Sequence, residues 1–295
     1  MNSEKKNGIL HIVATPIGNL GDISQRMRET LAAADIIACE DTRHTRKLLS
    51  HLNIRAKLTS CRRENEQEQA AALVTRLLAG ENVALVSDAG TPGLSDPGAV
   101  LVRTARAAGI TVLPVAGPSA LAAALSVAGL TGTEFYFGGF LAAKKSERCK
   151  QFAALKSLPC PLIFYEAPHR IEASLQDCLE IFGDRQAQLF RELTKLHEEH
   201  LAGPLSVLLD QLGGRARGEL VLIISGNETA PDSDKPDNLD ELILWHRDQG
   251  SSLKDAARQI AADLDLPRSQ VYQRALALWS SVAQGADLQY IEKNK

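Results

Sequence analysis

The sequence has no excess of charge of either sign, few aromatic residues and no ordered set of cysteines. Its 33 Lys and Arg stand against 36 Asp and Glu, and its net charge of −3 excludes a protein coated with basic side chains. Aromatic residues make up only 4% of the chain, so its core must be built from aliphatic side chains. The five cysteines are scattered without a CxxC pair, which predicts reduced thiols in a cytoplasmic protein.

Several common ligand-binding motifs are also missing. There is no GxxxxGK[ST], which excludes a P-loop nucleotide site, and no GxGxxG follows the first predicted strand. The cluster His197-Glu198-Glu199-His200 lacks the HExxH spacing that places two histidines one helical turn apart. We therefore expect neither a Rossmann dinucleotide site nor a bound metal.

The sequence lacks a convincing membrane span or signal peptide. No charged residue occurs between Arg106 and Glu134, but Pro114, Gly117 and Pro118 interrupt this stretch near its start. A strand, a tight turn and a buried Ala-rich helix explain it better than a membrane helix. The first residues are polar and lead directly into a predicted strand, so we expect a cytoplasmic protein without a membrane partner.

Short apolar segments alternate with helical patterns along most of the chain. The predicted strands are ILHIVAT, DIIACED, NVALVSD, ITVLPVA, EFYFGGF, PLIFYEA, AQLFREL and LVLIISG. Because most of them are continuously apolar, they predict sheets covered on both faces, and hence an α/β fold. The spacing changes near Gly139, which predicts one lobe at residues 8–138 and a second at 139–226.

A helical segment is predicted after the second lobe. Residues 227–238 are rich in Pro, Asp and Asn and are typical of a linker, and residues 239–295 have a purely helical pattern. Ser251 or Ser252 can begin a helix that a turn at Pro267 separates from the next one. This pattern fits a helix-turn-helix or a plain helical hairpin. Seven Lys or Arg against eight Asp or Glu argue against a DNA-binding domain.

Turns rich in Gly and Pro follow three of the predicted strands. They are residues 14–20, 87–98 and 116–120, and a further Gly-containing turn, Arg217-Gly218-Glu219, precedes the last strand. Ligands of open α/β sheets bind at the carboxyl ends of the strands, where glycine allows a close approach of the backbone. The three turns together therefore predict a ligand site.

The motifs in these turns resemble a known family. The segments TPIGNLGDIS, CEDTRHTRKLL, SDAGTPGLSDPG, AGPSA, FYEAPHR and RELTKLHEE occur in the order found in bacterial methyltransferases of small-subunit ribosomal RNA. Those enzymes are a branch of the tetrapyrrole (corrin/porphyrin) methylase superfamily. The resemblance extends from residue 8 to about residue 226, and the helical tail is also similar to the C-terminal segment of that branch.

The resemblance implies a two-lobed fold with S-adenosylmethionine in the cleft between the lobes, and a homodimer. It also implies methylation of the ribose 2′-hydroxyl of a cytidine in the decoding region of 16S ribosomal RNA, with the small ribosomal subunit as partner. The residues that match the cofactor site are Pro16, Asp88, Gly90, Thr91, Pro92, Ser119, Ala120, Tyr165, Leu220 and Val221. Thr91 replaces the usual Asp of the superfamily's Gly-Asp-Pro loop, which leaves no acid at that point.

The reaction needs a group that helps the ribose hydroxyl to lose its proton, either a base or a nearby cation. The candidates are Lys195, Asp41 and Glu166, of which Lys195 is preferred because it follows the end of a predicted strand. The alternative for each of them is an ordinary ion pair at the surface.

A segregated basic run predicts contacts with RNA phosphates. Residues 42–63 contain seven Lys or Arg and no Asp or Glu, with His44 and His51 in addition, and residues 142–150 contain four more cations. The predicted RNA contacts are Arg43, Arg46, Lys47, Arg62, Arg63, Lys144 and Lys145. Porphyrinoid carboxylates also attract cations, so a methyltransferase of small tetrapyrroles remains an alternative, as does a non-catalytic ribosome-binding protein.

Overall fold

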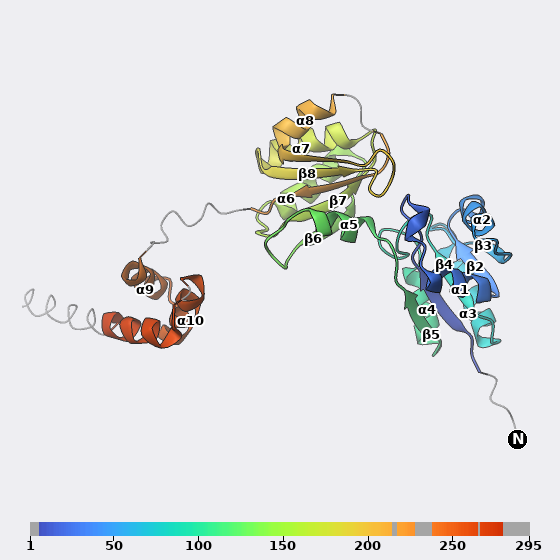
Figure 1. Ribbon diagram of the computed structural model, residues 1–295, viewed down its shortest axis with the longest axis horizontal. Helices are drawn as coiled ribbons and strands as arrows, with labels where there is room; N and C mark the ends of the chain where they lie inside the picture. The colour runs from blue at the N-terminus through green and yellow to red at the C-terminus, as the bar shows by residue number, and fades with distance from the viewer. Residues whose placement is uncertain (1–5, 214–216, 228–237, 265, 280–295) are drawn as a thin grey trace, which may run out of the picture. The chain divides into compact units, whose positions relative to one another are not determined.

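The computed structural model describes residues 6–213, 217–227, 238–264 and 266–279. The chain divides into two compact units, residues 1–227 and 228–295, and each is described by itself. The first unit contains two five-stranded sheets, and the second is helical wherever it is described as regular structure (Figure 1). This architecture confirms the predicted α/β fold with a helical C-terminal segment.

The first sheet is entirely parallel. Its strands are β1 (Ile9–Val13), β2 (Ile36–Cys39), β3 (Lys57–Ser60), β4 (Val83–Val86) and β5 (Thr111–Val115). They are arranged in the order β3-β2-β4-β1-β5. Strands β4, β1 and β5 are therefore neighbours, although β4 lies some 70 residues after β1 in the chain. The loops that follow these three strands consequently leave the sheet side by side.

Helices cover both faces of the first sheet. One face carries α1 (Gln25–Ala33) and α2 (Thr42–His51), and the other carries α3 (Glu66–Leu78) and α4 (Ala99–Ala107). Successive residues of β2 point to opposite sides, so that Ala38 packs with α3 and α4 whereas Ile37 packs with α1 and α2. This double burial is the reason that β2 and β4 are apolar at every position.

The second sheet is mixed. Its strands are β6 (Tyr136–Phe140), β7 (Leu162–Glu166), β8 (Gln186–Arg191), β9 (Glu199–Pro204) and β10 (Leu220–Ile224), in the order β6-β7-β10-β8-β9. Strands β6 and β7 are parallel, and the other pairs are antiparallel. The start of β10 therefore lies beside the ends of β7 and β8, where Leu220 is paired with both Glu166 and Arg191.

The second sheet is also covered on both faces. Helices α6 (Lys145–Leu155), α7 (Ile171–Phe182) and α8 (Leu205–Leu212) pack on one face, and α5 (Ala120–Val127) packs on the other. Ile17, from the loop after β1, joins the cluster beneath α5 and so connects the two sheets. The predicted change of lobe after residue 138 falls inside β6, and α5 already packs on the second sheet.

All eight predicted strands are present, but β3 and β9 were not predicted. Both are edge strands, and their burial patterns contain more exposed and half-buried positions than those of the central strands. Their sequences, KLTS and EHLAGP, are correspondingly polar. An edge strand needs no continuous apolar run, because one side of it faces no neighbouring strand.

The second unit contains α9 (Leu239–Asp248), α10 (Leu253–Asp263) and a further helical stretch at 268–279. Ser252 caps α10 by accepting a hydrogen bond from the Asp255 amide, as its residue type predicts. Arg274 holds α9 through Asp240, with 2.7 Å between its Nε and Oδ1. Residues 228–237, within the predicted linker, and 280–295 lie outside the described residues.

Among the described residues, no helix is both long enough and apolar enough to cross a bilayer. In particular, the uncharged stretch after Arg106 forms β5, a turn and the eight-residue helix α5.

Candidate functional site

The three Gly- and Pro-rich loops of the first lobe meet at the carboxyl ends of β4, β1 and β5. Thr15 and Gly90 exchange two backbone hydrogen bonds, of 2.9 and 3.1 Å, which tie the loop after β1 to the loop after β4. The Thr91 hydroxyl donates to the Pro118 carbonyl at 3.2 Å, so the loop after β5 is tied to them as well. The missing acid at Thr91 is thus replaced by a side chain that fixes the loops.

The second lobe supplies the opposite wall. Its residues come from the ends of β6, β7 and β8 and from the start of β10, which the antiparallel pairing brings to the same edge of the sheet. The Tyr165 hydroxyl accepts a hydrogen bond from the Leu121 amide at 3.1 Å, near the start of α5. The ring of Phe140 lies edge-on to that of Tyr165, with 5.5 Å between their centroids.

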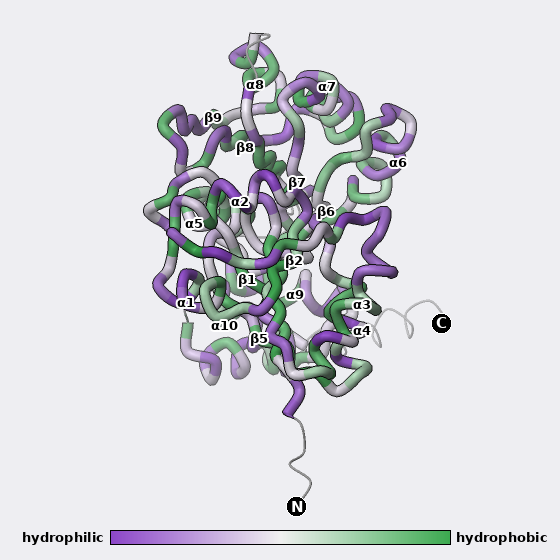
Figure 2. Tube along the Cα trace, turned by 90° about the vertical axis from the view of Figure 1, so that its right-hand side faces the viewer, coloured by the Kyte–Doolittle hydropathy of each residue, from purple (hydrophilic) through white to green (hydrophobic). Residues whose placement is uncertain are grey.

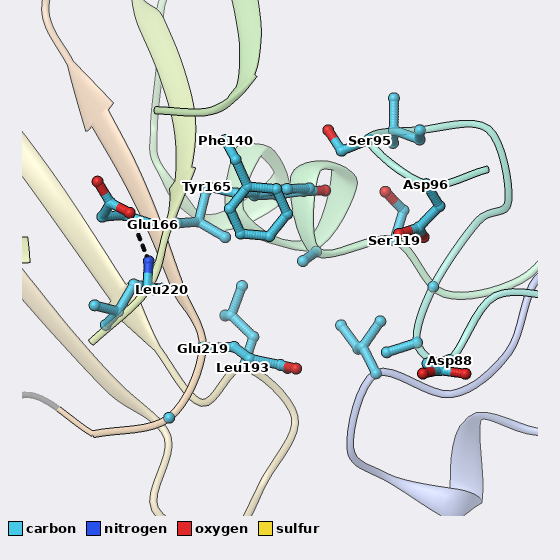
Figure 3. A pocket seen from close by; sticks show the side chains of 18 of the residues that line it. Asp88, Ser95, Asp96, Ser119, Phe140, Tyr165, Glu166, Leu193, Glu219 and Leu220 are labelled. Atoms are coloured by element: carbon cyan, nitrogen blue, oxygen red, sulfur yellow. Dashed lines mark hydrogen bonds between the residues drawn. The ribbon is translucent and has the colours of Figure 1, made fainter. Parts of the chain in front are cut away.

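These walls enclose a cavity of about 300 Å³, with Asp88, Asp96 and Ser119 on one side and Leu193, Glu219 and Leu220 on the other (Figure 3). The predicted cofactor residues that line it are Asp88, Gly90, Thr91, Ser119, Ala120, Tyr165, Leu220 and Val221. Pro16 and Pro92 do not line it. Pro16 borders a neighbouring cavity, and Pro92 lies beside Ile12 and Leu85, because successive residues of a turn face different sides.

The lining of this first cavity is acidic and apolar. Asp88, Asp96, Glu166 and Glu219 line it, and none of the described lining residues is Lys, Arg or His. Burial raises the pKa of Asp96 to about 6, and the charges of Glu40 and Asp88 add to the effect. Such a lining favours a ligand with positive charge and disfavours one that carries phosphates. Leu193, Leu220 and Val221 supply the apolar surface for a flat ring.

A second cavity, of about 310 Å³, shares part of its wall with the first. Ile17, Asp88, Ala89 and Glu219 line both. Its remaining walls are formed by Thr15, Pro16, Gly18, Leu20, His44, Lys47, Leu48, His51 and Lys195. Four side chains that are cationic when protonated thus border the second cavity, in contrast to the first. Among the predicted RNA contacts, Lys47 is placed here.

The three candidate catalytic residues lie at different places. The Glu166 carboxylate is buried and accepts hydrogen bonds from the Ala167 amide at 2.7 Å and the Ser174 hydroxyl at 2.6 Å. It also forms an ion pair with Arg170 at 2.5 Å. Although Glu166 borders the first cavity, these partners give its carboxylate a role in holding the loop after β7.

Asp41 begins α2 and is occupied by that helix. Its side chain accepts a hydrogen bond from the Arg43 amide at 2.8 Å and binds the Arg43 guanidinium at 2.8 Å. These hydrogen bonds with Arg43 hold the pKa of Asp41 well below its usual range. Asp41 is therefore a weak base, and it lines neither of the two cavities.

Lys195 borders the second cavity. Its ammonium binds the carboxylates of Glu192 at 2.8 Å and Glu219 at 3.2 Å. Partial burial alone would lower the pKa of Lys195, but the hydrogen bond with Glu192 and the charge of Glu219 raise it above its ordinary value. Lys195 therefore holds its proton at neutral pH, and of the two predicted roles its geometry favours a cation over a base.

Most of the other predicted RNA contacts have partners within the protein. Arg62 donates to the Glu40 carbonyl at 3.1 Å, and Arg63 donates to the Ser95 carbonyl at 2.8 Å. Lys144 and Lys145 begin α6, where Lys144 pairs with Glu147 and Lys145 pairs with two carboxylates of α7. Arg46 is exposed on α2 and makes no ion pair with the described residues. Figure 2 shows α2 as mostly hydrophilic.

The cluster at 197–200 has other partners than a metal. Glu199 binds Arg191 at 2.8 Å, and the His200 ring stacks on Phe190 and lies 3.0 Å from the Gln188 side-chain oxygen. Within the described part of the chain, no group of three or more His, Cys, Asp or Glu is arranged to hold a metal.

Several residues of the two cavities were not predicted individually. Asp96 lies within the turn 87–98 that the sequence singled out, and its acid could have been noticed as the second one in that turn. Phe140, Leu193 and Leu20 carry no such signal, because they are apolar residues at strand ends or in a loop. Only the fold brings them to a cavity.

Comparison with known proteins identifies the family. The family model described as Tetrapyrrole (Corrin/Porphyrin) Methylases matches residues 9–209. The chain belongs to the tetrapyrrole methylase family. A ribosomal RNA small subunit methyltransferase I from Xylella fastidiosa (strain Temecula1 / ATCC 700964) is 47% identical over 271 residues, which cover 90% of this chain and 98% of that protein. The protein of the same name from Escherichia coli O157:H7 is 43% identical over 279 residues, or 93% and 97% of the two chains.

Solved structures show the tetrapyrrole methylase fold for this chain. Diphthine synthase superimposes with a TM-score of 0.58 at 14% identity, over 74% of this chain and 89% of that one. Uroporphyrin-III C-methyl transferase from Thermus thermophilus, complexed with S-adenyl homocysteine, has a TM-score of 0.53 at 17% identity, over 73% and 97%. At these identities, the similarity concerns the fold alone.

Proposed function

We propose that this protein transfers the methyl group of S-adenosylmethionine to the ribose 2′-hydroxyl of a cytidine in the decoding region of 16S ribosomal RNA. The observation that carries the proposal is the pair of adjoining cavities, one lined by acidic and apolar residues and one that basic side chains also border. S-adenosylmethionine carries a sulfonium and an ammonium group, and RNA carries phosphates, so each cavity suits one of the two reactants. The relatives named as ribosomal RNA methyltransferases, which match this chain along nearly their whole length, support the RNA substrate.

The lining of the first cavity fits the cofactor. We assign its positive groups to the carboxylates of Asp88, Asp96 and Glu219, and its adenine to the apolar surface of Leu193, Leu220 and Val221. When bound, S-adenosylmethionine supplies an electrophilic methyl group that an oxygen nucleophile attacks in line. The tied loops hold this side of the site rigid, so that little ordering is needed when the reactants bind.

The residues of the chain act on the ribose hydroxyl through charge and position. Lys195 keeps its proton, and as a cation beside the second cavity it stabilises the ionised form of the ribose hydroxyl, whose proton passes to water. The ribose oxygen then bonds to the methyl carbon as the bond between that carbon and the cofactor sulfur breaks. Asp41 and Glu166, which are held by their own partners, serve to shape the site. A ribosomal substrate also implies that the reaction takes place in the cytoplasm, on RNA of the small subunit.

The test is an assay of methyl transfer from radiolabelled S-adenosylmethionine. The three substrates are naked 16S RNA, assembled small subunits and a tetrapyrrole, and both RNA substrates come from cells that lack this protein. We expect label in ribosomal RNA, and mass mapping should locate it on the ribose of a single cytidine. Label in the tetrapyrrole instead would establish the small-molecule alternative. No transfer to any substrate, together with binding to subunits, would establish a non-catalytic ribosome-binding protein.

We also propose a homodimer that forms through β5 and α5. No charged residue occurs between Arg106 and Glu134, and within this stretch Leu113 on the edge strand β5 is 41% exposed and Val127 on α5 is 59% exposed. Exposed apolar side chains within an uncharged stretch are side chains that a second copy of the chain can cover. Light scattering of the full chain in solution measures the number of copies.

Cofactor affinity should depend on pH through Asp96. Because the pKa of Asp96 is raised to about 6, this carboxyl takes up a proton as the pH falls from 7.5 to 5.5 and loses its attraction for a cationic ligand. The charged fraction of Asp96 falls from about 97% to about 24% over this range, so we expect calorimetry to show the affinity for S-adenosylmethionine falling by about threefold to fourfold. The Asp96→Asn variant should bind more weakly at pH 7.5 and show a flatter profile.

The same variant should be more stable without the ligand. Folding raises the pKa of Asp96, so this carboxyl binds its proton more tightly in the folded protein than in the unfolded one. The free energy of unfolding therefore falls as the pH rises past the ordinary pKa of an aspartate, and the full loss is reached above pH 6. Asp96→Asn should therefore raise the melting temperature more at pH 8 than at pH 5. An unchanged pH profile of affinity in the variant would show that Asp96 does not face the ligand.

Removal of residues 227–295 should leave a folded protein that binds the cofactor. Every residue that lines the two cavities precedes this cut, and residues 1–227 form one compact unit. The helical unit lines neither cavity, so the role left for it is to contact the ribosomal substrate. We therefore expect turnover on assembled subunits to fall when it is removed. Equal turnover and equal substrate affinity in the truncated and full-length proteins would assign the helical unit another role.

A further inference from the structure

The basic side chains beside the second cavity come mainly from one side of α2. His44, Lys47 and His51 are spaced by three and four residues, which places them on the same face of the helix, together with Leu48. All three of these polar side chains are exposed, and none makes an ion pair or a side-chain hydrogen bond with the described residues. They are therefore available to a ligand.

Neighbouring cations of the same basic run differ from these three. The Arg43 guanidinium is neutralised by Asp41 at 2.8 Å, and Arg62 and Arg63 donate to backbone carbonyls. None of these three arginines lines the second cavity. The run that looks uniform in the sequence is thus divided by the fold into cations that hold the protein together and cations that face a cavity.

The opposite wall of the second cavity is fixed by a close contact between the lobes. Lys195 crosses the loop after β1 so tightly that a Cβ on Gly18 would lie 2.3 Å from the Lys195 Cγ. Glu192 and Glu219 hold the ammonium group through ion pairs. The cavity is thereby bounded by the α2 face on one side and by Lys195 on the other.

The wall shared by the two cavities contains Ile17, Asp88, Ala89 and Glu219. A group that occupies the second cavity therefore lies next to whatever occupies the first. The second cavity, at about 310 Å³, has the size of an ordinary small-ligand pocket. It can take one nucleotide unit, whereas a paired and stacked helix is too bulky to enter.

We propose that the second cavity is the subsite for the target nucleotide, displaced from its helix or taken from a single-stranded loop. Its phosphate lies against His44, Lys47 and His51 on the α2 side of the cavity. Its ribose faces the wall shared with the first cavity, and Lys195 lies across the cavity from α2. This inference rests on the proposed function. Enzymes that modify one nucleotide in a structured RNA commonly extract it from the stack. Lys47 offsets the charge of the phosphate that follows the nucleotide, and the two histidines can donate hydrogen bonds to it.

Two variants test the subsite. Lys47→Glu reverses a charge on the α2 face, and Leu20→Trp fills the cavity with a bulky ring from a side chain that is already 47% exposed. We expect Lys47→Glu to raise the KM for the RNA substrate about tenfold and to reduce the slope of log affinity against log salt by about 1, as for the loss of one phosphate contact. Leu20→Trp should lower kcat/KM for RNA at least about tenfold, since one nucleotide no longer fits.

Controls separate this subsite from folding and from the cofactor site. Both variants should bind S-adenosylmethionine with unchanged affinity, and Lys47→Arg should restore the KM. Arg103→Glu makes the same change of net charge on the exposed side of α4, outside both cavities, and should leave the KM and the salt slope as in the wild type.

The outcomes distinguish the two proposals. A wild-type protein that methylates RNA, with both variants equally active, would overturn the subsite and leave the function in place. A wild-type protein that methylates no RNA would overturn the function itself. Equal losses in Arg103→Glu and Lys47→Glu would show a general effect of charge, and they too would overturn the subsite.

Discussion

Ser119→Trp and Gly90→Val should each reduce the affinity for S-adenosylmethionine at least about 100-fold, or about 2.8 kcal/mol. Ser119 faces the first cavity beside Asp96, so an indole ring at this position occupies the space of the ligand (Figure 3). Gly90 has a φ of +82°, which a β-branched residue adopts only with strain. Its Cβ would lie in ordinary contact with the Ile17 side chain, at 3.4 Å, so the expected loss comes from the backbone strain and from the methyl groups that valine adds to the cavity wall.

Isothermal titration calorimetry with S-adenosylmethionine measures both effects, and two variants serve as controls. Ser119→Ala keeps the space free and should bind nearly as well as the wild type. Gly93→Val introduces the same strain at the same φ of +82°, but a Cβ there meets nothing within 4 Å, and Gly93 does not line the first cavity. Wild-type affinity in Ser119→Trp would place the cofactor elsewhere.

Asp177→Ala should lower the free energy of unfolding by about 3–5 kcal/mol, the usual cost of leaving a buried charge without its partner. The side chains of Asp177 and Arg148 are 3% and 4% exposed, and Arg148 Nε donates to Asp177 Oδ2 at 2.8 Å. Arg148 also donates to the carbonyls of Ala142 and Ala143. Without Asp177, the segment between β6 and α6 loses the anchor that this arginine provides.

Urea unfolding followed by circular dichroism measures the loss. Glu180→Ala is the matched control, since Glu180 also lies on α7 and pairs with Lys145, but its side chain is 65% exposed. An exposed ion pair contributes less than about 1 kcal/mol. Replacing Arg148 and Asp177 together by Met and Leu should recover much of the lost stability, because both buried charges are then removed. Equal effects of Asp177→Ala and Glu180→Ala would contradict the assigned role.

The sequence could not distinguish a buried arginine from a surface cation. Arg148 belongs to the cations of residues 142–150 that suggested phosphate contacts, yet it is closed off beneath α7. Periodicity along α6 does not reveal this, because the partner Asp177 lies 29 residues later on another helix. Asp41 and Arg43 are only two positions apart, but their mutual pairing depends on the directions of both side chains, which the sequence does not give.

The motifs predicted which loops lie together at the edge of the sheet, but not the partners of the candidate catalytic groups. Eight of the ten predicted cofactor residues line one cavity, since a turn after a parallel strand must lie at the carboxyl edge of the sheet. Pro16 and Pro92 are the two exceptions, because the side to which a residue of a turn points depends on the local backbone. The assignment of the cavity to S-adenosylmethionine stays a proposal until binding is measured.

By itself, the sequence determined eight of the ten strands, the α/β class and the family, because these follow from local apolar runs and from uninterrupted motifs. The tertiary structure alone decided which loops meet. Strands β4, β1 and β5 are neighbours only through crossovers, and β10 meets β7 and β8 only through antiparallel pairing. The tertiary structure also decided which charged side chains border each cavity. The acidic lining of the first cavity and the basic side chains of the second come from segments that are far apart in the chain, and such long-range proximity leaves no local pattern in the sequence.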